Sequence, residues 1–320
     1  MLRIIALVLF LAGIQYVNAQ SSEDLINSMI EATRTRNYEG IFVFNRGQDM
    51  ETMRILHKSD ENGEREKITA LTGSAREFIR NNDTVTCIFP DKEEVMVERS
   101  RAQSFVGKFA DSVELIAEYY DFSTISEERV AGRDTWVVKI TPRDEFRYGY
   151  QMWIDKDNHL LLKSEMLDDE GEVLEMVMFT DLRLHDTIPD ELFNPSITGD
   201  EFTWYQYTQE SLVNITPQSR SGGNWQLTWM PAGFQLSVYD GHSLTEEDDQ
   251  LEHMIYSDGI STVSIFIERI GANRVIDSGS LRLGAVNVYS KTTNGFQVTA
   301  VGEVPQPTVI RMVNSLAEGN

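Results

Sequence analysis

Short runs of alternating hydrophobic and polar residues fill most of the stretch 41–181. Alternation with a period of two is typical of β-strands, and the runs are separated by turn sequences such as SDENG (59–63) and DDEG (168–171). About eleven strands joined by hairpins are predicted, and a sheet of this size has to curl in order to hide its edges. The predicted fold class is therefore mainly β with helices: a large curled antiparallel half-barrel followed by a smaller α+β domain.

Three segments instead place apolar residues at helical spacing. The first follows two capping candidates, Ser21 and Ser22, and its buried face comprises Leu25, Ile26, Met29 and Ile30. A second helix is predicted over 110–119 by the same spacing. The third begins at Pro307, which is a favourable first helical residue, and continues to Leu316.

The pattern also divides the chain. From Asp190 the periodic apolar positions become sparse, and the polar sequence NITPQSRSGG (214–223) is typical of a linker. Further on, Asn294-Gly295 favours a type I′ hairpin turn. The strands predicted in this part are 225–229, 234–239, 253–256, 262–270, 285–292 and 296–301. We expect a signal peptide at 1–19, a first domain at 20–195, a linker at 196–223 and a small α+β domain at 224–320.

The first nineteen residues resemble an export signal rather than part of the fold. Arg3 supplies the positive start, residues 4–14 form an apolar run too short to span a bilayer, and Val17-Asn18-Ala19 is a small-residue cleavage sequence. The mature protein is expected to begin near Gln20 and to be exported.

Charge changes the set of expected partners. The 320 residues include 28 Lys and Arg against 51 Asp and Glu, a formal net charge of -23. Binding to nucleic acid depends on Lys and Arg that displace counterions, so nucleic acid is not an expected partner. Hydrophobic residues make up 41% of the chain, which is enough for a sizeable core.

Cys87 is the only cysteine, so no intramolecular disulfide can form. Alternation within TVTCIFP (84–90) places Val85, Cys87 and Phe89 on one face of a strand. The expected role of Cys87 is that of a buried, inert thiol.

Sequence signatures of enzymes are missing. There is no G-x-S-x-G, H-E-x-x-H, Walker or Rossmann motif, and the five histidines are scattered without a close pair at metal-ligand spacing. Asp155-Lys156-Asp157 resembles the start of a calcium loop, but Leu160 stands where such a loop needs glycine, so a hairpin turn is the better interpretation. We predict no catalytic residue, no metal ligand and no cofactor.

Several strands of the predicted half-barrel are apolar on both faces. Such a sheet needs a covering layer on each side, or it leaves an apolar cavity that can take an acyl chain. The candidates for a lipid pocket are Phe42, Phe44, Met152, Trp153 and Met178. Ordinary core filling is the alternative for each of them.

The stretch 129–147 is locally basic within this acidic chain. Bidentate arginines there could hold a phosphorylated lipid head group or an acidic peptide. The head-group candidates are Arg129, Arg133, Arg143 and Arg147. The alternative is a solvated rim of the sheet.

A series of longer motifs, in order and spread over most of the chain, resembles one known family. In the first domain these motifs are NYEGIFVF (37–44), LTGSAREFIR (71–80), AGRDTWVVKITPRDEFRYGYQMWID (131–155) and LLLKSEMLDDEGEVLE (160–175). In the second they are LTWMPAGF (227–234), YSDG (256–259) and GEVP (302–305). The family is that of the periplasmic regulators of the sigma-E envelope-stress response, of the RseB/MucB type.

The resemblance implies a first domain similar to the lipoprotein carriers LolA and LolB, and a periplasmic location. It also implies a partner, the periplasmic part of a membrane-anchored anti-sigma factor, which is shielded from regulated proteolysis until lipopolysaccharide or mislocalised lipoprotein releases the regulator. A homo-oligomer is possible within this interpretation.

The partner-binding candidates are Trp229, Phe234 and Tyr256, because aromatic residues dominate interface hot spots. Core packing is the alternative for all three. For the whole protein, the alternative function is that of a periplasmic lipid or lipoprotein carrier, which would need the cavity alone.

Overall fold

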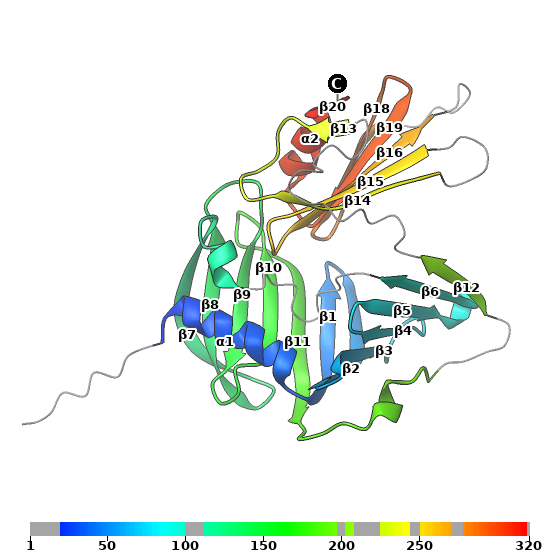
Figure 1. Cartoon of the computed structure of the whole chain (residues 1–320). Coiled ribbons are helices and arrows are strands. Elements are labelled where there is room, and N and C mark those ends of the chain that lie inside the picture. Colours follow the sequence, from blue (N-terminus) through cyan, green and yellow to red (C-terminus); the bar gives the residue numbers. More distant parts are fainter. Residues whose placement is uncertain are drawn as a thin grey trace, which may run out of the picture.

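The computed structural model describes residues 20–99, 112–196, 202–207, 225–243, 250–270 and 278–318, and the predicted signal peptide lies outside these ranges. Two β-sheets organise the molecule (Figure 1). Among the described residues, neither α-helix combines the length and hydrophobicity that crossing a membrane requires.

The first sheet contains twelve strands in the spatial order β12-β6-β5-β4-β3-β2-β1-β11-β10-β9-β8-β7. The eleven strands predicted over 41–181 are all present. Their bounds are β1 Tyr38–Arg46, β2 Asp49–Asp60, β3 Gly63–Ala70, β4 Glu77–Asn81, β5 Thr84–Phe89, β6 Glu94–Arg99, β7 Tyr120–Val130, β8 Arg133–Pro142, β9 Gly149–Asp155, β10 Leu161–Leu167 and β11 Val173–Leu184. The predicted fold class, curled antiparallel β-structure with helices, is confirmed.

One strand of this sheet was not predicted. β12 (Thr203–Tyr207) pairs in parallel with β6 at the edge of the sheet. It falls within 196–223, which the sequence pattern indicated as a linker. Five residues are too few for a clear periodic signal, so the pairing is decided by the neighbouring strand rather than by the segment itself.

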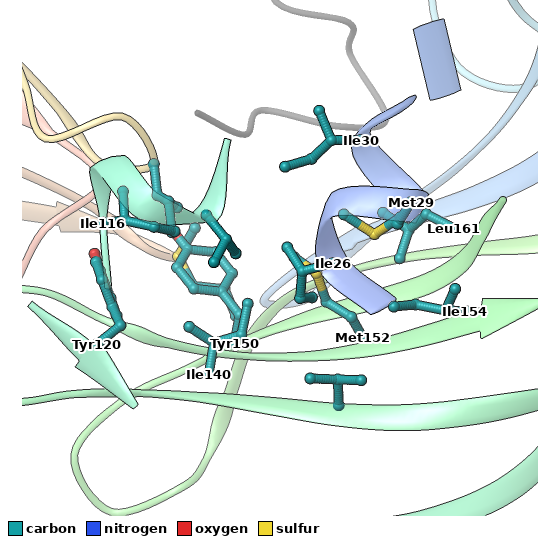
Figure 2. Packing of buried hydrophobic residues seen from close by; sticks show 14 of the residues in the cluster. Ile26, Met29, Ile30, Ile116, Tyr120, Ile140, Tyr150, Met152, Ile154 and Leu161 are labelled. Carbon is teal, nitrogen blue, oxygen red and sulfur yellow. The ribbon is translucent and has the colours of Figure 1, made fainter. Parts of the chain in front are cut away.

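Helix α1 (Ser22–Thr35) lies across strands β7 to β11, as Figure 1 shows. Its start follows the prediction, because the Ser21 hydroxyl accepts a hydrogen bond from the Asp24 backbone N–H at 3.0 Å. In Figure 2, Ile26 and Met29 of α1 lie over Met152 and Ile154 of the sheet. The helix therefore covers one face of this half of the sheet.

The helix predicted over 110–119 is largely wrong. Its described part contains only a 3-10 helix, η2 (Val113–Leu115), followed by a turn. The Asn27 side chain of α1 fixes this turn, since its oxygen accepts from the Val113 N–H at 3.0 Å. One short turn is enough to bring Val113, Ile116 and Tyr120 into the same core cluster, so the apolar spacing did not require a full helix.

The second sheet has six strands in the order β14-β15-β16-β19-β18-β17, and a separate pair joins β13 and β20. The bounds are β13 Trp225–Leu227, β14 Gln235–Ser243, β15 Gln250–Ser257, β16 Thr262–Arg269, β17 Gly279–Leu283, β18 Val286–Thr293, β19 Phe296–Gly302 and β20 Leu316–Glu318. Helix α2 (Gln306–Asn314) packs against β18 and β19. Asn294 and Gly295 both have positive φ, 48° and 84°, which confirms the predicted type I′ turn.

The prediction that Cys87 is buried is wrong. In β5 the fully buried residue is Ile88, and Cys87 on the opposite face is half-buried. The physical reason lies in the chain after β11: the Ser196 N–H donates to Glu77, which is paired with Ile88, at 2.8 Å. This segment, which includes the 3-10 helix η3 (Asp190–Phe193), covers the Ile88 face.

Candidate functional site

The two domains meet at the loop 143–148 between β8 and β9. At its centre Arg147 is buried, with a side chain 0% exposed. Its Nη1 lies 2.9 Å from Oδ2 of Asp258, whose side chain is also 0% exposed and which belongs to the turn between β15 and β16. A buried charge needs a partner of opposite sign, and here each domain supplies one of the two.

Further bonds complete the surroundings of this ion pair. Arg147 donates to the Ala232 carbonyl at 2.6 Å and pairs with Asp144 of its own loop at 2.9 Å. The Tyr120 hydroxyl donates to Oδ2 of Asp258 at 3.0 Å. We refer to Arg147, Asp258 and Tyr120 as the junction cluster.

Aromatic rings surround the buried guanidinium. Its carbon lies 5.0 Å from the ring centre of Tyr119 and 5.5 Å from that of Phe234 in the second domain. A cation held over the faces of aromatic rings is stabilised electrostatically, more so where water is excluded. Close packing also explains Gly233, because a Cβ there would lie 2.3 Å from the Tyr119 ring.

A second group of contacts extends the junction beside the loop. The Thr308 hydroxyl at the start of α2 donates to the Phe146 carbonyl at 2.8 Å. The Phe146 ring meets Trp229 edge to face at 5.0 Å, and the guanidinium of Arg311 lies 3.9 Å from the Trp229 ring centre. Asn287 donates to the Tyr148 hydroxyl at 2.9 Å. These contacts dock the second domain against the first in this structure.

The environment sets the protonation of the tyrosines. Burial, together with the negative charge of Asp258, raises the pKa of Tyr120 far above its usual range. Burial likewise raises the pKa of Tyr150 well above normal, and that of Tyr256 to about 12. These hydroxyls stay neutral at physiological pH, so Tyr120 acts as a hydrogen-bond donor to the carboxylate.

The lipid-pocket candidates lie in packed regions. Phe42, Met152 and Trp153 are fully buried, whereas Phe44 and Met178 are half-buried. Met152 packs under α1, while the other four belong to or border a second cluster. A nearby hollow lined by Thr33, Leu161 and Phe179 has no room for even one water molecule, whereas ligand pockets begin at roughly 300 Å³.

The four head-group candidates do not converge on one site. Arg129 and Arg133 lie at the hairpin between β7 and β8, whereas Arg143 and Arg147 lie beyond the far end of β8. At about 3.3 Å per residue, the ten residues of β8 separate the two groups by roughly 30 Å. Arg147, moreover, is enclosed in the junction.

The partner-binding candidates lie at the junction or in the second core. Phe234 and Tyr256 are each 4% exposed and belong to the core of the second domain, and half-buried Trp229 packs against that core. The structure thus brings together Arg147 and Phe234, which the sequence assigned to different roles.

Asp258 and Tyr120 were not singled out by the sequence. The signal for Asp258 was present, since YSDG (256–259) is a turn in which the Asp side chain can bond the backbone that follows. Its Oδ1 accepts the N–H groups of Ile260 and Ser261 at 3.0 and 2.7 Å. Nothing in this local pattern indicates that the other carboxylate oxygen binds an arginine 111 residues earlier.

Within the described ranges, no group of three or more His, Cys, Asp or Glu side chains is arranged to hold a metal ion. The sequence around Asp155 forms the predicted turn, in which Asp155 accepts from the Asp157 N–H at 2.8 Å. The polar contacts described here join strands and domains, and their chemistry is that of binding and positioning.

A large curled sheet, a small α+β domain and a buried polar junction between them define a two-domain binding protein whose domains are docked against each other. The chain belongs to the MucB/RseB family: the family's N-terminal domain matches residues 21–197, and its C-terminal domain matches residues 219–317.

Individual relatives extend over nearly the whole chain. The sigma factor AlgU regulatory protein MucB of Pseudomonas aeruginosa is 31% identical over 328 residues, covering 98% of this chain and 98% of the relative. The sigma-E factor regulatory protein RseB of Haemophilus influenzae is 27% identical, covering 98% and 96%.

Solved structures agree with these sequence matches. The Pseudomonas aeruginosa MucA/MucB complex contains a chain with a TM-score of 0.73 and 28% identity, covering 93% of this chain and 99% of that one. A crystal structure of MucB in complex with MucA(peri) gives a TM-score of 0.71 and 27% identity, covering 94% and 100%. These relatives are regulatory proteins by name.

Proposed function

We propose that this protein is a periplasmic negative regulator of sigma-E-type signalling that binds the periplasmic part of a membrane-anchored anti-sigma factor and protects it from regulated proteolysis. The observation that carries this proposal is the full-length similarity to MucB, whose structure is known in complex with MucA(peri). The similarity includes both domains, so it favours a function that needs both rather than the first alone.

Among the partner-binding candidates, Trp229 is the most accessible. Phe234 and Tyr256 are buried, so their contribution is to shape the surface rather than to touch a partner. The Trp229 ring carries the exposed Arg311 guanidinium on its face. This cationic and aromatic pair suits an acidic or aromatic side chain of a partner segment.

Binding can be tested by titrating a purified anti-sigma periplasmic fragment into the protein in a calorimeter. The mixture is then digested with the protease that makes the first regulated cut in the anti-sigma factor. We expect a saturable complex and slower cleavage. Trp229→Ala should weaken binding, whereas Trp204→Ala, which removes a 65% exposed tryptophan of β12, is the matched control. Absence of both binding and protection for the unaltered protein would overturn the proposal.

We further propose that lipopolysaccharide or a mislocalised lipoprotein releases the partner. An acyl chain gains about 0.8 kcal/mol per buried methylene, so it can bind without a charged contact. Phe44 and Met178 are the half-buried members of the predicted pocket, and Arg129 and Arg133 are the head-group candidates that lie together at the β7–β8 hairpin. Titrating lipopolysaccharide against the preformed complex tests this: the expected result is displacement, and an unchanged complex at saturating lipid contradicts it.

A lipid or lipoprotein carrier remains the second candidate, because one surface favours it. Strands β4 to β6 present Phe78, Cys87 and Met96 side by side on one face, and all three are half-buried. A carrier should move a fluorescent phospholipid between vesicles without any anti-sigma fragment. Transfer without binding to the fragment would favour the carrier, and the reverse would favour the regulator.

A further inference from the structure

We propose that the tip of the β15–β16 hairpin, residues 257–261, is a removable plug in the first domain's core, and that the ion pair of Arg147 and Asp258 is its latch. Withdrawal of the plug would separate the domains and open apolar surface beneath α1. The proposal rests on contacts within this chain and is independent of which partner the protein binds.

The evidence for a plug is that residues of the second domain belong to the first domain's core. Figure 2 shows this cluster, which is built from α1, from η2 with the residues that follow it, and from strands of the first sheet. Two of its members come from the second domain: Ile260 at the tip of the β15–β16 hairpin and Ala285 in the turn between β17 and β18. They are 4% and 0% exposed. The second domain therefore completes a core that the first domain leaves unfinished.

The evidence for a latch is the double use of one carboxylate. Oδ1 of Asp258 accepts from the Ile260 and Ser261 N–H groups and so shapes the tip that carries Ile260. Oδ2 accepts from Arg147 and Tyr120 and so attaches that tip to the first domain. The shape of the plug and its attachment therefore depend on the same side chain.

The junction can open without unfolding either domain. The second domain has a separate core of its own, which includes Phe234, Val263 and Val309. On withdrawal Arg147 keeps its ion pair with Asp144 and its position over the Tyr119 ring, both in the first domain. Asp258 moves into water, where a carboxylate is well solvated. Neither charge is left buried and unpaired in the open form, so this form is accessible.

The open and closed forms differ in what they can bind. Opening exposes apolar side chains such as Ile116 and Tyr150, which favours an apolar ligand. A partner that spans both domains favours the closed form. By linkage each ligand weakens the other, with no need for overlapping sites.

Two variants test the latch and the plug in the full chain. Asp258→Asn keeps Oδ1 as the acceptor that shapes the turn but removes the charge that faces Arg147. Ile260→Ser keeps the latch but removes the apolar plug. The matched control is Arg183→Met, because Arg183 pairs with Asp181 of its own strand β11 at 3.2 Å and its side chain is 69% exposed.

The readouts are the radius of gyration from X-ray scattering and the fluorescence of the apolar dye 8-anilinonaphthalene-1-sulfonate. Asp258→Asn should raise the open population on the order of a hundredfold, with a larger radius and stronger dye binding. Ile260→Ser should change both in the same direction, and Arg183→Met should change neither. Far-UV circular dichroism identifies folded variants, and if Asp258→Asn does not fold, Ile260→Ser decides. A folded Ile260→Ser protein with the radius and dye binding of the control overturns the proposal, whatever the outcome with an anti-sigma fragment.

Discussion

Two buried clusters of charged side chains stabilise different parts of this protein. The junction cluster joins the two domains through Arg147 and Asp258. The second, which we call the inner cluster, comprises His57, Glu64 and Arg80 and lies entirely within strands β2 to β4. Both contain a buried guanidinium paired with a carboxylate, so their chemistry is similar and their positions differ.

The polar groups of the inner cluster form hydrogen bonds with residues that are close in the sequence. Nδ1 and Nε2 of His57 lie 2.7 Å from the Arg36 carbonyl and 2.9 Å from Oε1 of Glu64. Both ring nitrogens thus lie within hydrogen-bond distance of groups of the first domain. Arg80 donates to the same Glu64 oxygen, and the His57 ring stacks on Tyr38 with 4.8 Å between ring centres.

Sequence separation distinguishes the two clusters. Glu64 is 7 residues from His57 and 16 from Arg80, whereas Arg147 and Asp258 are 111 residues apart. Partners on adjacent strands are brought close by the hairpins themselves, at a small cost in loop entropy. Partners in separate domains meet only while the domains are docked. The inner cluster therefore stabilises the first sheet, whereas the junction cluster stabilises the docked arrangement of the two domains.

The largest expected effect is that of Arg80→Met, which leaves Glu64 and Glu66 without their guanidinium. Loss of one partner from a buried ion pair typically costs about 3–5 kcal/mol. Urea denaturation should show this loss in the unfolding of the first domain, without the domain separation expected of Asp258→Asn. Arg65→Met, which removes a more exposed pair with Asp190, is the control and should destabilise the domain much less. Equal losses for both would contradict the comparison.

The second prediction concerns acid. Burial would raise the pKa of Glu64, but hydrogen bonds from His57 and Arg80 lower it overall, from 4.5 to about 2. Because the folded pKa is the lower one, the carboxylate stabilises the fold above pH 4.5, and this contribution is lost as the pH falls through 2. It amounts to about 3 kcal/mol.

Urea denaturation at a series of pH values measures this contribution. The difference in unfolding free energy between the unaltered protein and Glu64→Gln should be full above pH 4.5 and should shrink toward pH 2. Exposed Glu61 on the same hairpin provides the control, Glu61→Gln, whose difference should stay small throughout. A Glu64→Gln difference that does not change with pH would contradict the assignment.

Two glycine substitutions have smaller expected effects. Their comparison separates the cost of backbone strain from the cost of a steric clash at the junction. Gly233 has a φ of +86°, and a Cβ there would meet the Tyr119 ring under Arg147. Gly47 has a φ of +63° with nothing within 4 Å. Gly47→Ala should cost about 1 kcal/mol from backbone strain alone, and Gly233→Ala about 2–4 kcal/mol from strain plus overpacking. Equal costs by thermal denaturation would mean that the Tyr119 ring moves aside freely.

The smallest predicted effect lies outside both clusters. Asn294 occupies a left-handed position with a φ of 48° in the β18–β19 hairpin. Asn294→Ala should cost about 1 kcal/mol, since alanine tolerates this conformation less well. Scattering should show no domain separation. A change in radius of gyration would mean that a general loss of stability separates the domains even when the junction contacts are intact.

Much of the fold could be predicted from local sequence. The Ser21 cap, the eleven strands of 41–181 and the turn at Asn294 each follow from residues next to one another, and the structure confirms them. The site could be predicted only in part. Arg147 and Phe234 were singled out, but for other roles, because a sequence shows that an arginine is present and not that a distant carboxylate buries it.

By itself, the sequence determined most of the strands, the two α-helices, several of the turns, and the family to which the chain belongs. Only the tertiary structure decided which face of β5 is buried, that β12 adds to the first sheet, and that Asp258 binds Arg147. The reason is physical: periodicity and turn residues act over a few positions, whereas burial and ion pairing depend on whatever element packs alongside. At the junction that element belongs to the other domain.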